Sequence, residues 1–305
     1  MRAVSLSRNP LLMKFNRYKW VYLLFLPLFT FAFVFDYLPI YGIQIAFKDF
    51  RPVAGIWGSN WAGLKYFIRM FQEPTFLRVF RNTVVISFLK IGLVFPAGIL
   101  FALLLNEIAS VATKRVYQTI SYLPHFMSWI VLAGIVRDIT AIDGPINFII
   151  TKFGMAPQVF LANSKAFVPI LIISDLWQTV GWNSIIYLAA ITGISKELYE
   201  SADMDGAGRI RKIISITLPS ITPVILIMFI LRLGGVMNAG FGQILNLYNP
   251  LVYEVADIID TYVYRVGLLQ MNFSYSTAIG LFKNVIGLMM VLITNHLSRR
   301  IEGTI

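Results

Sequence analysis

The sequence predicts an all-α membrane protein with about six transmembrane helices. Three observations support this fold class. Of the 305 residues, 57% are hydrophobic, and the mean hydropathy of the chain is +0.72. Charged residues make up only 13% of the chain, whereas a soluble domain carries about 25%. Apolar stretches of about 20 residues recur, and one such stretch forms a helix long enough to cross the roughly 30 Å hydrocarbon core of a bilayer.

The expected spans cover residues 20–40, 82–105, 119–137, 167–192, 219–238 and 276–297. Helix breakers stand near several of the expected ends, at Pro39, Pro124, Pro169, Pro219 and the Asn249-Pro250 pair. Residues 1–19 form a basic N-terminal segment, 41–81 an extracytoplasmic loop, and 298–305 a cytoplasmic tail. The spans between 82 and 297 form the core membrane domain, which contains the polar segment 195–219.

Lys and Arg residues set the expected orientation, because they are retained on the cytoplasmic side of a membrane. The N-terminal segment carries Arg2, Arg8, Lys14, Arg17 and Lys19, and no small-residue cleavage site follows the first apolar run, so we expect an uncleaved first span. With the N-terminus inside, thirteen bases fall on the inner segments and ten on the outer ones, six of them in the loop 41–81. Both termini and the polar segment are therefore expected in the cytoplasm.

The composition excludes several classes of function. The net charge is +11, but much of it flanks apolar spans, so we expect membrane lipid and no nucleic acid as a partner. The chain contains no Cys, His125 and His296 stand alone, and no carboxylates cluster at metal-ligand spacing. The dipeptide Gly-Lys does not occur, which excludes a phosphate-binding GxxxxGK[ST] loop. We expect no catalytic residue, metal or cofactor on this chain, and a membrane enzyme has no support in the sequence.

A polar segment from Glu197 to Pro219 lies between two apolar stretches. Ser195 is a suitable N-cap, and Glu197 would stand in the first helical turn, where negative charge is favourable. This helix should end at Asp205-Gly206, because Gly permits a left-handed turn.

A second short helix would follow, with Asp205 and Arg209 placed to pair, before Pro219 begins the next span. The segment thus predicts two short helices at an angle. They would form either a knob that inserts into a groove of another protein or an ordinary solvated loop.

The spacing of residues in this segment resembles the EAA motif of ABC importer permeases. The matching pattern is Glu200-Ser201-Ala202, then Gly206, then Ile216-x-Leu218-Pro219, with Ser201 in place of the first Ala of the triplet. The tripeptide Asp205-Gly206-Ala207 is similar to the one usual at this place in the sugar-importer branch of the family. The stretches 35–50, 247–268 and 276–295 resemble the LplB-type polysaccharide permease subgroup, so that the resemblance covers nearly the whole chain.

The resemblance implies a type I ABC importer permease fold in a bacterial cell membrane, with 195–219 carrying a cytoplasmic coupling helix. The implied coupling residues are Glu200, Ser201, Ala202, Asp205, Gly206, Ala207 and Pro219. The implied partners are a second homologous permease, two ABC ATPase subunits that hold ATP and Mg, and an extracytoplasmic sugar-binding protein that delivers oligosaccharides. An ion-coupled secondary transporter or a channel for polar solutes is the alternative, with Asp175 as the deep carboxylate.

Charged residues inside the expected spans are costly, so each should face a cavity or a partner. These are Lys90, Asp175, Arg232 and Lys283; Arg232 and Lys283 could instead extend to the outer headgroups. Aromatic rings stack on sugar rings, and amides bond to hydroxyls. The candidate substrate path therefore combines residues of both kinds with basic ones: Trp177, Gln178, Asn183, Tyr187, Arg232, Asn238, Gln243 and Asn284. Aromatic residues in the outer segments indicate either an interfacial belt or a docking platform.

Overall fold

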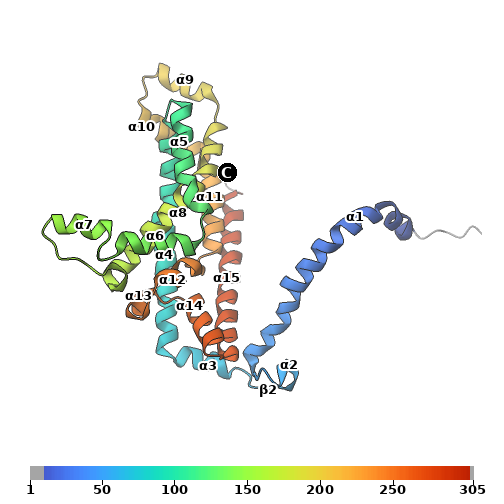
Figure 1. The fold of residues 1–305 in the computed structure, drawn as a ribbon. Coiled ribbons are helices and arrows are strands. Elements are labelled where there is room, and N and C mark those ends of the chain that lie inside the picture. Colours follow the sequence, from blue (N-terminus) through green and yellow to red (C-terminus); the bar gives the residue numbers. More distant parts are fainter. Residues whose placement is uncertain (1–9, 303–305) are drawn as a thin grey trace, which may run out of the picture.

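The structure is a computed structural model that describes the backbone from Pro10 to Glu302 and the side chains from residue 17 to residue 296. The first nine residues of the basic N-terminal segment and the last three of the tail lie outside the described residues. Four long helices pack side by side, α4 (Pro74–Asn106), α8 (Ser164–Thr192), α11 (Leu218–Gly234) and α15 (Phe273–Glu302) (Figure 1). Apolar residues of α4, α8 and α11, among them Leu105, Leu188 and Ile221, form one buried cluster between them.

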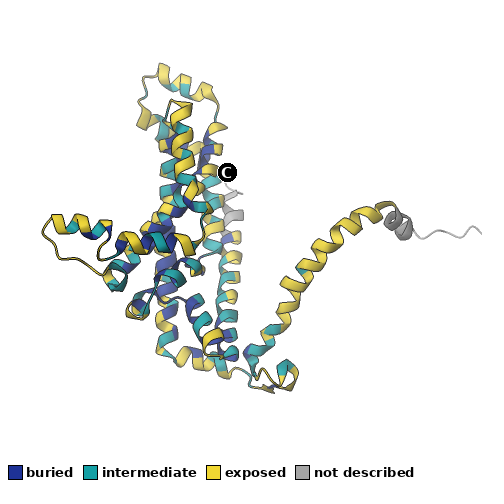
Figure 2. Cartoon of the chain, in the orientation of Figure 1, coloured by how far each residue is buried: buried dark blue, intermediate teal, exposed yellow. Residues whose placement is uncertain are grey.

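The first part of the N-terminal helix stands apart from this bundle, and its last part packs against α15 (Figure 1). The helix comprises α1 (Pro10–Ala32), a π-helical turn (Phe33–Tyr37) and a 3₁₀ segment (Leu38–Phe47). From residue 17 to the end of the π-helical turn its side chains are almost all exposed (Figure 2), whereas residues 44–47 of the 3₁₀ segment are half-buried or buried. The strands β1 (Lys48–Asp49) and β2 (Asn60–Trp61), which pair antiparallel, and α2 (Gly55–Gly58) connect it to α3 (Lys65–Gln72) at one end of the bundle.

In the described part of the chain, four helices are long and apolar enough to cross a membrane: Arg17–Phe47, Pro74–Asn106, Arg209–Gly234 and Phe273–His296. A fifth span would be the bent pair Val111–Phe126 and Trp129–Lys152. The remaining expected span, over 167–192, corresponds to α8, which has 29 residues and so exceeds the length required. Its middle carries the polar residues Asp175, Gln178 and Asn183.

The span expected over 119–137 is interrupted by a sharp bend. The chain forms α5 (Val111–Tyr122), a 3₁₀ turn (Leu123–Phe126) and α6 (Trp129–Thr140). The helical segments on the two sides of this turn are bent by 107° relative to each other. Pro124 lacks an N–H and Met127 is extended, which ends the helix. The bend packs closely on α8 at Gly181, where an added Cβ would lie 2.3 Å from the Ser121 carbonyl oxygen.

The span expected over 219–238 starts earlier and ends earlier than predicted. Helix α10 (Arg209–Lys212) continues through a π-helical segment (Ile213–Thr217) into α11, which ends at Gly234. Short helices follow: α12 (Phe241–Leu247), a 3₁₀ turn (Pro250–Val252), α13 (Tyr253–Ala256), α14 (Ile259–Tyr264) and a π-helical turn (Arg265–Leu269). Helix α7 (Pro145–Lys152) projects sideways from the bundle, and a 3₁₀ turn (Phe160–Ala162) precedes α8 (Figure 1).

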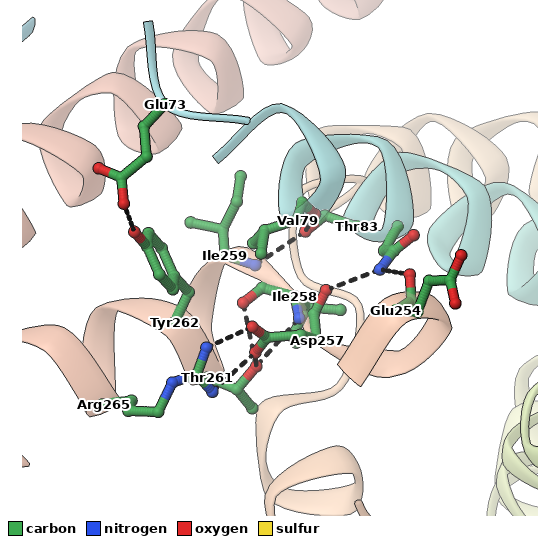
Figure 3. A network of polar contacts seen from close by, with 11 residues as sticks. Glu73, Val79, Thr83, Glu254, Asp257, Ile258, Ile259, Thr261, Tyr262 and Arg265 are labelled. Atoms are coloured by element: carbon green, nitrogen blue, oxygen red, sulfur yellow. Dashed lines mark hydrogen bonds and ion pairs between the residues drawn. The ribbon is translucent and has the colours of Figure 1, made fainter. Parts of the chain in front are cut away.

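A buried polar network holds the segment 254–265 against α4 (Figure 3). Asn82 Nδ2 donates to the carbonyl oxygens of Glu254 and Asp257 at 2.9 and 3.2 Å, and Thr83 Oγ1 accepts from the Ile259 N–H at 2.9 Å. The fully buried Asp257 pairs with Arg265. Burial opposes the charge of Arg265, but the hydrogen bonds and charge of Asp257 prevail and raise the pKa of the guanidinium.

Candidate functional site

The polar segment 195–219 forms a short helix, as predicted, followed by the start of a long one, at one end of the molecule (Figure 1). Ser195 Oγ accepts a hydrogen bond from the Glu197 N–H at 3.3 Å, which confirms the expected cap. Helix α9 (Lys196–Met204) ends at Gly206, whose φ of +71° is the left-handed turn expected there. The next turn is closed by Ala207, whose N–H donates to the Ala202 carbonyl oxygen at 2.9 Å.

Two details of this segment differ from expectation. The ion pair joins Lys212 to Asp203, and the pair expected between Asp205 and Arg209 is not formed among the described residues. Pro219 lies inside a helix that is continuous from Arg209 to Gly234, so it does not begin a new helix. The π-helical turn before Pro219 accommodates its missing N–H.

The end of the molecule formed by α9 and α10 is exposed and carries apolar side chains. Leu198, Met204 and Ile210 are exposed, whereas Ala202 and Ala207 are half-buried on the inner side of the turn. Beneath the turn lies a pocket of about 490 Å³, lined in part by Ala202, Gly206 and Arg211. Tyr199 and Thr217 share a hydrogen bond of 2.8 Å between their hydroxyls, which ties α9 to the helix that leads into α11.

Three of the candidate path residues meet in one cavity of about 220 Å³ between α4, α8 and α11. Asn183 and Tyr187 of α8 face Arg232 of α11, and Phe95 of α4 completes the polar and aromatic part of the wall. Arg232 is exposed and lines this cavity. It has no ion-pair partner among the described residues.

The other candidate path residues lie elsewhere. Asn238 lines a second cavity of about 590 Å³ beside α14 and α15, where Lys283 pairs with Asp260 at 2.5 Å. Trp177 lines an apolar pocket between α6, α7 and α8. Gln178 is buried, and Asn284 is exposed on α15. The candidate path residues therefore do not line one common cavity.

Gln243, the remaining path candidate, belongs to a buried polar cluster. Lys90 Nζ lies 3.2 Å from Asp175 Oδ1 and donates to Gln243 Oε1 at 2.5 Å. Gln243 Nε2 in turn donates to the Leu171 carbonyl oxygen and to Ser174 Oγ at 2.7 and 2.8 Å. Lys90 and Asp175 thus satisfy the expectation that a membrane-buried charge faces a partner. Lys90 and Gln243 are 153 positions apart in the sequence, and no local pattern could have indicated their contact.

An aromatic group at the bend between α5 and α6 was also missed. The His125 ring stacks on Trp182 of α8 with centroids 4.3 Å apart and an angle of 6°. Phe126 contacts the same indole edge-on at 5.6 Å. The sequence had suggested only an isolated interfacial histidine, because the stack depends on the unpredicted bend.

Comparison with known proteins defines the class to which this fold and these sites belong. The chain belongs to the family described as "Binding-protein-dependent transport system inner membrane component", whose profile matches residues 94–303. The fold is that of a type I ABC importer permease. The chain is a membrane-embedded transport subunit, and the resemblance noted in the polar segment is confirmed at the level of the family.

Individual relatives cover almost the whole chain. The polygalacturonan/rhamnogalacturonan transport system permease protein YteP of Bacillus subtilis is 46% identical over 96% of this chain and 92% of its own length. Protein LplB of the same organism is 42% identical over 94% of this chain and 91% of its own. A bacterial ABC transporter involved in the import of the acidic polysaccharide alginate has a chain with a TM-score of 0.89, 40% identity, and coverage of 96% here and 99% there.

Proposed function

We propose that this permease imports acidic oligosaccharides and that Arg232 binds their carboxylate groups. The observation that carries the proposal is the cavity that places a guanidinium without a carboxylate partner in the described chain beside Asn183 and Tyr187. A guanidinium binds a carboxylate through two parallel hydrogen bonds, the amide and the phenol suit sugar hydroxyls, and Phe95 offers a ring face. One relative is named for the transport of polygalacturonan and rhamnogalacturonan and a structural neighbour for the import of alginate, which supports the same substrate class.

We propose that the energy for transport comes from two ABC ATPase subunits that hold ATP and Mg. Helix α9 would insert into a groove of an ATPase, with Glu200, Ser201, Ala202, Asp205, Gly206 and Ala207 forming the coupling surface. The helix from Arg209 to Gly234 has 26 residues, or about 39 Å, and its far end carries Arg232. A displacement of α9 would therefore reach the cavity along one continuous helix.

The remaining partners follow from the same assignment. A second homologous permease would complete the path, and an extracytoplasmic binding protein would deliver the substrate. A solved alginate importer in complex with a pentasaccharide-bound periplasmic protein, whose chain is 39% identical with a TM-score of 0.88, supports such a delivery step. The polar segment and both termini would face the cytoplasm, because the bases are more numerous there.

Uptake of labelled oligosaccharides tests the proposal. Cells that express the complete importer should take up an oligogalacturonide and discriminate against a neutral oligosaccharide of equal length. Arg232→Gln should reduce uptake of the acidic substrate by about tenfold or more, since a charge-assisted hydrogen bond contributes roughly 1.5–3 kcal/mol. Arg78→Gln, at an exposed position near the start of α4, serves as the charge-matched control. Equal uptake of both substrates, unchanged in Arg232→Gln, would refute the proposal.

A further inference from the structure

An apolar pocket of about 350 Å³ lies between α6, α7 and α8, apart from the polar cavity that contains Arg232. Its apolar lining comes from six residues, Val136, Ile139, Ile146, Ile170, Ile173 and Trp177. Its two hydroxyls are bonded to protein: Thr140 Oγ1 donates to the Val136 carbonyl oxygen at 2.7 Å, and Ser174 Oγ donates to that of Ile170 at 2.6 Å. Neither hydroxyl proton is therefore free to bind water or sugar.

The α8 side of the pocket lies within the span expected over residues 167–192. Helix α8 begins at Ser164, so the stretch from Ile170 to Trp177 lies about 9 to 20 Å along it. The hydrocarbon of one leaflet is about 15 Å thick. Ile173, Trp177 and Ile139 are 64%, 41% and 40% exposed, so that the pocket opens to the surroundings of the protein.

The neighbouring helix α7 has the features of a lipid-facing segment. Phe148 and Ile149 are exposed, and Lys152 at its end lies over the Phe148 ring, 4.4 Å from the centroid. A lysine at the end of an exposed apolar helix extends toward lipid phosphates. Figure 1 shows α7 projecting sideways from the bundle next to α6.

We infer that this pocket binds one acyl chain of a membrane phospholipid. The occupant is apolar because the lining is apolar, and it comes from the bilayer because the pocket opens beside an expected span. Ser174, which lines the pocket, accepts a hydrogen bond from Gln243 at 2.8 Å. A bound chain would thus separate the buried Lys90, Asp175 and Gln243 from water. The inference is independent of the proposed substrate.

Quenching of Trp177 by brominated lipid tests this inference. The importer, purified with its co-purifying subunits, is reconstituted in phosphatidylcholine and phosphatidylglycerol vesicles with acyl chains that are either brominated at mid-chain or plain. Wild type should show a quenched component that Trp177→Phe lacks. Ile139→Phe should reduce this component by about half or more, because a ring fills the pocket. Ile149→Phe, the same change at an exposed position on α7 outside the pocket, should leave it unaltered.

Two outcomes would overturn the inference. If Trp177 is not quenched in the assembled importer, a partner subunit covers the pocket. If Trp177 fluorescence is quenched equally in Ile139→Phe and Ile149→Phe, Trp177 contacts only the bulk bilayer. Native mass spectrometry gives a second measurement: wild type and Ile149→Phe should retain a phospholipid in delipidating detergent, and Ile139→Phe should lose it. Should Ile139→Phe fail to assemble, Ile173→Phe fills the same pocket.

Discussion

Lys90 of α4 and Asp175 of α8 form an ion pair that is almost completely buried, with Nζ 3.2 Å from Oδ1. The pair lies between two long helices of the bundle and holds Gln243 at the start of the short helices that follow α11. Asp175 Oδ2 has no hydrogen-bond partner among the described residues. The pair therefore determines how the segment after α11 packs against α4 and α8.

Removal of one partner of this pair should destabilise the protein strongly. Asp175→Leu leaves a buried ammonium without its carboxylate, a change that costs about 3–5 kcal/mol in buried pairs, whereas replacement of both partners by apolar residues is often close to neutral. We expect a large loss of melting temperature in Asp175→Leu and substantial recovery in the double variant Lys90→Met/Asp175→Leu. Thermal unfolding followed by size-exclusion chromatography measures both. Equal losses in single and double variants would show that the packing, not the charge, matters.

The contact between α8 and the bend at Ser121 requires a residue without a side chain. Gly181→Ala would place a Cβ 2.3 Å from the Ser121 carbonyl oxygen, and a backbone group cannot move aside easily. We expect a marked drop in the yield of monodisperse protein. Gly92→Ala in α4 is the matched control, because its Cβ meets nothing within 4 Å and alanine favours a helix. A normal yield for Gly181→Ala would show that the bend is not packed in this way.

The left-handed turn at Gly206 should be necessary for ATPase coupling. Gly206→Ala meets no steric obstacle, but its φ of +71° is unfavourable for residues with a Cβ, at about 1–2 kcal/mol. We expect co-purification of the ATPase, or transport-coupled ATP hydrolysis, to fall about five- to thirtyfold. Gly208→Ala, with equal space and a φ of −70°, should behave as wild type. Equal behaviour of the two variants would contradict the coupling role of the turn.

The exposed cluster around Asp49 should make a small pH-dependent contribution to stability. Hydrogen bonds from Lys65 and Tyr66 hold the pKa of Asp49 below its usual value of 3.8. Because the folded-state pKa is the lower one, this contribution is present above pH 3.8 and is lost as the pH falls through the folded-state pKa. The melting temperatures of wild type and Asp49→Asn should therefore differ above the folded-state pKa of Asp49 and converge below it. A constant difference down to lower pH would contradict the linkage.

The polar segment was predictable because its signals are local. A cap at Ser195 and a glycine at Gly206 act over a few residues, and the spacing up to Pro219 resembles a family motif. The bend at Pro124 was not predictable from apolar content alone, because residues on both sides of it are apolar and proline is tolerated within membrane helices. The sequence likewise assigned Asn183, Tyr187 and Arg232 to expected spans. The cavity that they share depends on how α8 and α11 pack.

The partners of the charged residues in the spans were likewise not predictable from the sequence. The sequence predicts that Lys90 and Asp175 need partners, since their burial is costly. It does not reveal that they are each other's partners, because 85 residues separate them. Trp177, grouped with the path residues by composition, faces the apolar pocket instead. A helix that carries both polar and aromatic residues on several faces does not reveal which face lines the path.

The central claim is that Arg232 binds the carboxylates of the transported sugar, and substrate-stimulated ATPase activity of the reconstituted importer tests it most directly. With the binding protein present, an oligogalacturonide should stimulate ATP hydrolysis by the wild-type complex, and a neutral oligosaccharide of equal length should not. Arg232→Gln should lose most of this stimulation while its basal activity stays unchanged. Equal stimulation by both sugars, or full stimulation of Arg232→Gln by the acidic one, would contradict the account.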